Sequence, residues 1–144
     1  MNKKPLTKLF VATALAVIVL TTSARGQSTG TYSVKAMPAS IVKTVPEGCA
    51  TDVDPGLKEV TVTFSKDMKP GTWSVCKSTP EENYPGTGDG PMHYLSDKRT
   101  CVMPVKLKPG RTYVLWFNRG QYQGFRDAGG MSSVPYMLVF ETKK

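Results

Sequence analysis

Few side chains in this 144-residue sequence have the type and spacing needed for catalysis. His93 is the single histidine, and a nucleophilic site built on it would need a nucleophile and an orienting acid nearby. Neither the G-x-S-x-G motif nor the H-E-x-x-H motif occurs in the chain. We therefore interpret His93 as a surface or structural residue and predict no catalytic residues. An unusual small hydrolase is the alternative.

The acidic and cysteine residues do not form a complete metal-ligand pattern. The aspartates sit in turns, where their side chains accept backbone hydrogen bonds, and Asp52 and Asp54 lack the further carboxylate that a calcium site needs. Cys49, Cys76 and Cys101 are too far apart for a local zinc pair. A Cys49–Cys76 bridge and a Cys76–Cys101 bridge both remain open. We expect no metal and no cofactor, with weak calcium binding as the alternative.

Aromatic residues are the best candidates for a binding surface. Trp116 has the outward parity of a predicted strand, and Tyr84 and Tyr122 lie in two long irregular segments. Exposed aromatic rings in loops suit sugar or protein binding. Outward parity in a two-layer fold also fits a ring that a neighbouring loop partly covers. We predict Tyr84, Trp116 and Tyr122 as binding residues.

The elements that position these residues are organised around residues 107–117, Leu-Lys-Pro-Gly-Arg-Thr-Tyr-Val-Leu-Trp-Phe. Pro109 and Gly110 are typical of a turn, and the alternation that follows them predicts a strand. Tyr113, entering a strand after such a turn, is typical of a tyrosine corner, in which the hydroxyl bonds to backbone just upstream. We predict structural roles for Tyr113 and for Trp73, the latter as the core tryptophan of a β-sandwich.

The other predicted strands are short and separated by turns. Val60, Val62 and Phe64 share one face of the clearest strand, at 58–65. Further strands are predicted at 40–45, 72–76, 93–95, 100–107 and 134–142, with long loops at 77–91 and 118–133. Six or seven such strands without helical periodicity predict an all-β, antiparallel β-sandwich.

Parity within the strands also places three individual residues. Cys101 alternates in phase with Met103 and Val105, so we expect its thiol in the core. Cys76 has the opposite parity to Val75 and is expected to point outward. Pro104 cannot donate to a β-ladder, so we place it at an edge, at a bulge, or where its nitrogen faces away from a partner strand.

The first 26 residues have the features of an export signal. Three lysines precede an uncharged apolar run at 9–20, and Ala24 and Gly26 supply small residues for cleavage before Gln27. The run is shorter than the roughly 17–25 residues that a membrane-spanning helix needs. An uncleaved N-terminal anchor is the alternative. The predicted organisation is a signal peptide at 1–26, a flexible lead-in at 27–38 and one domain at 39–144.

The charge balance argues against nucleic-acid binding. The whole chain has 19 basic and 11 acidic residues, a formal charge of +8. The predicted signal peptide holds four of the basic residues and none of the acidic ones, so the 118 residues after it carry +4. This charge is ordinary for a soluble protein. We expect one exported domain with its own core, no nucleic-acid partner and no membrane span after cleavage.

Several short segments match one known pattern in order along the chain. They are Val60-Thr-Val-Thr-Phe-Ser-Lys-Asp-Met68, Leu107-Lys-Pro-Gly-Arg-Thr-Tyr113, Asp127-Ala-Gly129, and the stretches 40–48, 52–55 and 140–142. Together they cover residues 39–142 and resemble the bacterial Ig-like domains of the S-layer (SbsA) type. Gly130, which stands where that family often has asparagine, the loop 77–91 and the three cysteines depart from the pattern.

The resemblance implies an immunoglobulin-like β-sandwich of about seven strands, used as a spacer, stalk or adhesion module, without enzymatic activity. We predict an exported module, periplasmic, secreted or on the cell surface, that binds an envelope protein or glycan through its long loops. One alternative is a purely structural envelope or surface-layer component that self-associates through its sheet edges. The small hydrolase is the other.

Overall fold

Alternation of apolar and polar residues produces the strands of this protein. The computed structural model describes residues 32–78 and 80–144, and Tyr32–Lys144 forms one unit. The predicted signal peptide lies outside the described residues, and so does the first part of the lead-in. The predicted domain boundaries therefore stay a prediction.

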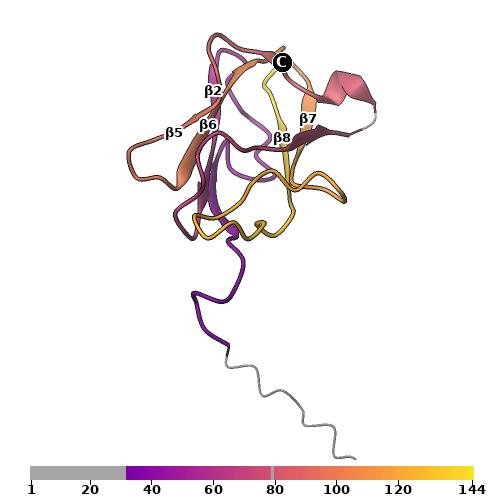
Figure 1. Cartoon of the computed structure of the whole chain (residues 1–144). Helices are drawn as coiled ribbons and strands as arrows, with labels where there is room; N and C mark the ends of the chain where they lie inside the picture. The colour runs from indigo at the N-terminus through magenta and orange to yellow at the C-terminus, as the bar shows by residue number, and fades with distance from the viewer. Residues whose placement is uncertain (1–31, 79) are drawn as a thin grey trace, which may run out of the picture. The chain divides into compact units, whose positions relative to one another are not determined.

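The strands of the described residues form two sheets (Figure 1). The first sheet has the order β1-β2-β6-β4, with β5 also pairing with β6. Its strands are β1 (Ile41–Val45), β2 (Glu59–Phe64), β4 (Gly86–Thr87), β5 (His93–Tyr94) and β6 (Thr100–Lys106). The second sheet, in the order β3-β7-β8, consists of β3 (Val75–Lys77), β7 (Thr112–Phe117) and β8 (Tyr136–Glu141). All these strand pairs are antiparallel, which confirms the predicted all-β sandwich.

The core lies between the two sheets and follows the predicted parity. In β2, Val60, Val62 and Phe64 are buried and alternate with accessible polar residues. Cys101 is 1% exposed, which confirms its predicted place in the core. The other buried core residues are Ala39, Met68, Met103, Val105, Tyr113, Leu115, Phe117, Phe125, Leu138 and Phe140.

Tyr113 has the geometry of the predicted tyrosine corner. Its ring is 2% exposed and packs against Phe140, with the ring centroids 5.4 Å apart. Its hydroxyl oxygen accepts a hydrogen bond from the backbone N–H of Lys108 at 2.7 Å. The turn at Pro109 and Gly110 is thereby joined to the core, and Gly110 adopts the left-handed conformation with φ of +60°.

The strand predicted at 72–76 is wrong in its first half, since β3 begins at Val75. Residues before it bond to the long loop at 118–133, called the late loop below, instead of to β7: the Oγ of Ser74 accepts the N–H of Gly124 at 2.8 Å. A side chain at Gly124 would lie 2.4 Å from the carbonyl oxygen of Trp73, so only glycine permits this close approach. Trp73 itself is half-buried beside Tyr94 rather than central in the core.

The long loop predicted at 77–91 contains two short regular elements. A 3-10 helix, η1 (Glu81–Asn83), follows β3, and the two residues of β4 then pair with the end of β6. Pro104 lies in β6, which is an inner strand, and its nitrogen faces away from a partner strand as predicted. The N–H of Val105 donates to the carbonyl oxygen of Lys58 on the β2 side of β6. Because successive backbone groups alternate in direction, the nitrogen of Pro104 faces the opposite side. On that side it lies between the residues of β6 that pair with β4 and those that pair with β5.

Candidate functional site

The outward surface of the β3-β7-β8 sheet is the candidate binding surface. Cross-strand partners share a face of a sheet, and Trp116 pairs with Cys76 of β3 and with Met137 of β8. The next outward row joins Val114 to Val139. Met137 is 48% exposed and the other four residues are half-buried. We call these five residues the apolar face; they also confirm the outward orientation predicted for Cys76.

The outward surface of the first sheet has a different chemistry. Here β2 presents Glu59, Thr61 and Thr63 to solvent, while Val102 and Pro104 of β6 are buried. The accessible part of these two strands is therefore polar, as expected for the solvated side of an antiparallel sheet. The apolar face departs from this rule, because apolar side chains occupy each of its two central rows.

Arg119 lies over one side of Trp116. The guanidinium carbon is 5.2 Å from the centroid of the indole, which is a cation–π contact. Arg119 and Tyr122 exchange two backbone hydrogen bonds of 2.9 Å, so residues 119–122 form a tight turn with Gly120 at φ of +54°. Tyr122 is 58% exposed on this turn. Trp116 and Tyr122 are thus linked through Arg119.

Asn118 fixes the base of this turn, and sequence reasoning missed it. The residue is fully buried and has a φ of +57°, a conformation that asparagine tolerates better than most residues. Its Nδ2 donates to the carbonyl oxygen of Phe125 at 2.9 Å and to the Oγ of Ser133 at 3.0 Å. Its Oδ1 accepts the N–H of Phe125 at 2.9 Å. An asparagine directly after an alternating strand and before Arg-Gly was the signal that could have revealed it.

Tyr84 does not join the other two predicted binding residues. Its ring is half-buried against the core at the end of η1, with the Nζ of Lys77 5.7 Å from the ring centroid. Burial, and secondarily the neighbouring Cys76 thiol group, raises the pKa of Tyr84. It lines two grooves of about 300 and 430 Å³; within the described chain neither groove includes Trp116 or Tyr122. The expectation of an exposed loop tyrosine is wrong, because the ring is half-buried and packs against the core.

Reactive side chains are dispersed. His93 is exposed, and its Nδ1 lies 3.2 Å from the carbonyl oxygen of Pro91 in its own loop. Cys49, Cys76 and Cys101 carry free thiols, so neither of the two bridges considered above is present. Among residues 32–78 and 80–144, no group of three or more His, Cys, Asp and Glu side chains could hold a metal ion. In the same residues, no helix combines the length and apolar character that spanning a bilayer requires.

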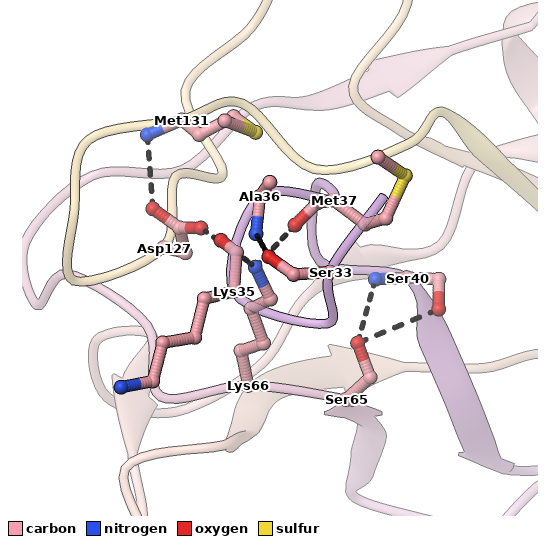
Figure 2. Close-up of polar contacts among 9 residues, drawn as sticks. All are labelled: Ser33, Lys35, Ala36, Met37, Ser40, Ser65, Lys66, Asp127 and Met131. Carbon is pink, nitrogen blue, oxygen red and sulfur yellow. Dashed lines mark hydrogen bonds and ion pairs between the residues drawn. The ribbon is translucent and has the colours of Figure 1, made fainter. Parts of the chain in front are cut away.

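Lys66 connects the lead-in to the late loop (Figure 2). Its ammonium group donates to the carbonyl oxygens of Lys35, at 3.0 Å, and Met37. The same group lies 3.6 Å from Oδ2 of Asp127, whose Oδ1 accepts the N–H of Met131 at 2.9 Å. We call this set of contacts the Lys66 bridge. Both charged side chains belong to segments that carry the family resemblance, and their surfaces are largely buried, 18% and 9% exposed.

Comparison with known protein families finds a match over most of the chain. The family model described as bacterial Ig-like domain matches residues 34–142, which confirms the resemblance drawn from the sequence motifs. Among solved structures, the chain is similar to the crystal structure of the S-layer protein rSbsC(31-844), with 16% sequence identity and a TM-score of 0.44. That match covers 76% of this chain and 14% of the S-layer chain. No curated protein matches the chain.

Proposed function

Because the chain belongs to the bacterial Ig-like domain family, we propose that it is a non-enzymatic binding or adhesion module of the bacterial cell envelope. In this proposal the signal peptide at 1–26 exports the chain, and the domain binds an envelope protein or glycan. Membership of this family supports an extracellular or cell-surface location for the chain. The dispersed positions of His93 and the three cysteines support a role in binding rather than catalysis.

The apolar face, with Trp116 and Arg119 at one end of it, is the observation that carries the proposal. Aromatic and arginine side chains are enriched at the centres of protein interfaces, because both bury a large contact area and also hydrogen-bond or stack. Tyr122 extends the same surface as an exposed ring on a turn whose base is held by the buried Asn118. The hydrogen bonds of Asn118 hold the turn in place in the free protein, which reduces the entropy lost on binding.

Affinity capture from the native envelope, with chemical crosslinking, tests this function. Trp116→Ala and Tyr122→Ala are compared with wild type, and Tyr32→Ala is the control because Tyr32 is an aromatic residue that is 87% exposed in the lead-in. We expect an envelope component to be captured by wild type and Tyr32→Ala and lost with Trp116→Ala and Tyr122→Ala. Equal capture by all four proteins, or no capture by wild type, would overturn the proposal. Thermal unfolding of each variant verifies that it is folded.

A further inference from the structure

The apolar face carries opposite charges at its two ends. Glu141 lies at one end, where it pairs in register with Thr112 and accepts a hydrogen bond from its hydroxyl at 3.2 Å. Arg119 lies at the other end, over Trp116. Thr112 and Trp116 are four positions apart along β7, which corresponds to a distance of roughly 14 Å. Within the described part of the chain, neither Arg119 nor Glu141 takes part in an ion pair.

This arrangement is complementary to itself. A two-fold axis that lies in the interface, parallel to the sheet and perpendicular to its strands, between the row of Trp116 and the row of Val114, places a second copy face to face with the first and reverses the direction of its strands. Arg119 of one copy then faces Glu141 of the other, twice, and Trp116 lies over Val114 and Val139 of the facing copy. The same patch serves both subunits, as an isologous interface requires. We infer that the partner of the apolar face is a second copy of this chain, packed face to face.

This inference rests on the proposed function, because it names the partner of the surface assigned there. It differs from self-association through sheet edges, since no backbone pairing between copies is involved. Two strands of six residues and one of three give a flat surface of roughly 250 Å² per copy. Stable interfaces bury about 800 Å² per partner, so the dimer is weak, with a dissociation constant in the micromolar range or above. Copies concentrated on one surface would still associate.

Charge reversal provides the test. The full chain, expressed with its own leader and purified after export, is studied by sedimentation equilibrium from about 10 µM to about 1 mM, the range that brackets a micromolar dissociation constant. We expect wild type to dimerise as its concentration rises. Arg119→Glu and Glu141→Arg should each weaken dimerisation about fivefold to tenfold, because each places like charges opposite one another. The double variant should return to within about threefold of wild type, because it restores both pairs with reversed polarity.

Glu59→Lys is the matched control, since it reverses an exposed charge on the outward surface of the first sheet. It should leave dimerisation unchanged. A wild type that stays monomeric at about 1 mM overturns the inference. Single reversals without effect overturn it as well, and so does a double variant that fails to recover, provided that thermal unfolding shows all variants folded.

The two proposals fail in distinguishable ways. If the chain stays monomeric but captures an envelope component through Trp116, the homodimer is refuted and the proposed binding function stands. If the chain dimerises with the expected response to charge reversal and captures nothing from the envelope, the homodimer stands on its own test and the proposed binding of an envelope component is refuted. If neither occurs, both are refuted.

Discussion

At the residue scale, Tyr113 gives the sharpest test of the tyrosine corner. Replacing it by phenylalanine removes the hydroxyl that accepts the Lys108 N–H but leaves the buried ring against Phe140. We expect Tyr113→Phe to lower the free energy of unfolding by about 0.5–1.5 kcal/mol, the net contribution of one hydrogen bond. Urea titration measures this, with the exposed Tyr122→Phe as control. Equal midpoints for wild type and Tyr113→Phe would show that the hydroxyl contributes nothing.

The cysteines should differ in reactivity because burial differs. Burial raises the pKa of the Cys101 thiol to about 12, so almost no thiolate exists at neutral pH, whereas Cys49 is exposed. We expect iodoacetamide to label Cys49 in the folded protein and to spare Cys101 until the protein is unfolded. Mass spectrometry of proteolytic peptides reads out each site. Rapid labelling of Cys101 in the folded state would contradict its burial.

The same shift sets a direction for stability at alkaline pH. An unfolded cysteine has a pKa of about 8.5, below the folded value, so above that pH the unfolded chain loses its proton first. Stability associated with Cys101 is therefore fully present below about pH 8.5 and declines as the pH rises toward the folded pKa. Cys101→Ala should show a smaller loss of stability over this pH range than wild type, although its unfolding free energy starts lower.

At the element scale, the Lys66 bridge ties the lead-in to the late loop. Trypsin cleaves after lysine, and the carbonyl group of Lys35 is one of the two that Lys66 holds. We expect Lys66→Met, which keeps most of the side-chain volume but removes the charge, to accelerate cleavage after Lys35 several-fold, as local opening becomes easier. Timed digestion followed by mass spectrometry measures the rate.

Lys69→Met is the control for that digestion, because Lys69 is exposed and close in sequence. Its cleavage rate after Lys35 should match wild type. Unchanged cleavage in Lys66→Met would mean that other contacts hold the lead-in, such as the 3.0 Å hydrogen bond from the Ser40 N–H to the Oγ of Ser65 (Figure 2).

The sequence predicted elements well where each strand carries its own alternation. Val60, Val62 and Phe64 face the core, and Tyr113 and Phe117 follow the same rule in β7. It failed where contacts between distant segments decide the backbone. Trp73 is outside β3 because Gly124, about fifty residues later, packs against its carbonyl. No local pattern around residue 73 encodes that contact.

At the scale of the whole molecule, the candidate site depends on sheet order, which parity alone does not give. The sequence predicted that Trp116 points outward, but not that Cys76 and Met137 flank it. Those neighbours come from strands that are separated from β7 by 34 residues before it and by 18 residues after it. The register of β7 and β8 also places Arg119 and Glu141 at opposite ends of the apolar face, and the sequence alone does not predict that register.

The sheet edges are protected, and this bears on how copies of the chain could associate. The outer edge of β8 is covered, because the N–H of Cys49 donates to Val139 and the N–H of Glu141 donates to Ala50. The edge strand β3 has only three residues. In the first sheet, β1 forms one edge; it has an irregular register between Ile41 and Lys43, and Lys43 is exposed. Bulges, short strands and lysines are the devices that prevent edge pairing.

The final prediction concerns β1, which with five residues is the longest edge strand of the first sheet in the described residues. Lys43→Val removes its lysine and leaves three valines in the strand Ile-Val-Val-Thr-Val. We expect this variant to form oligomers larger than dimers on prolonged incubation, because an apolar, uncharged edge can template further strands. Light scattering over time measures this. Lys58→Val, a change of the same charge at an exposed residue just before β2, should behave as wild type. If Lys43→Val also stays free of oligomers, the register shift alone protects β1, and edge-to-edge assembly is blocked by backbone geometry rather than by charge.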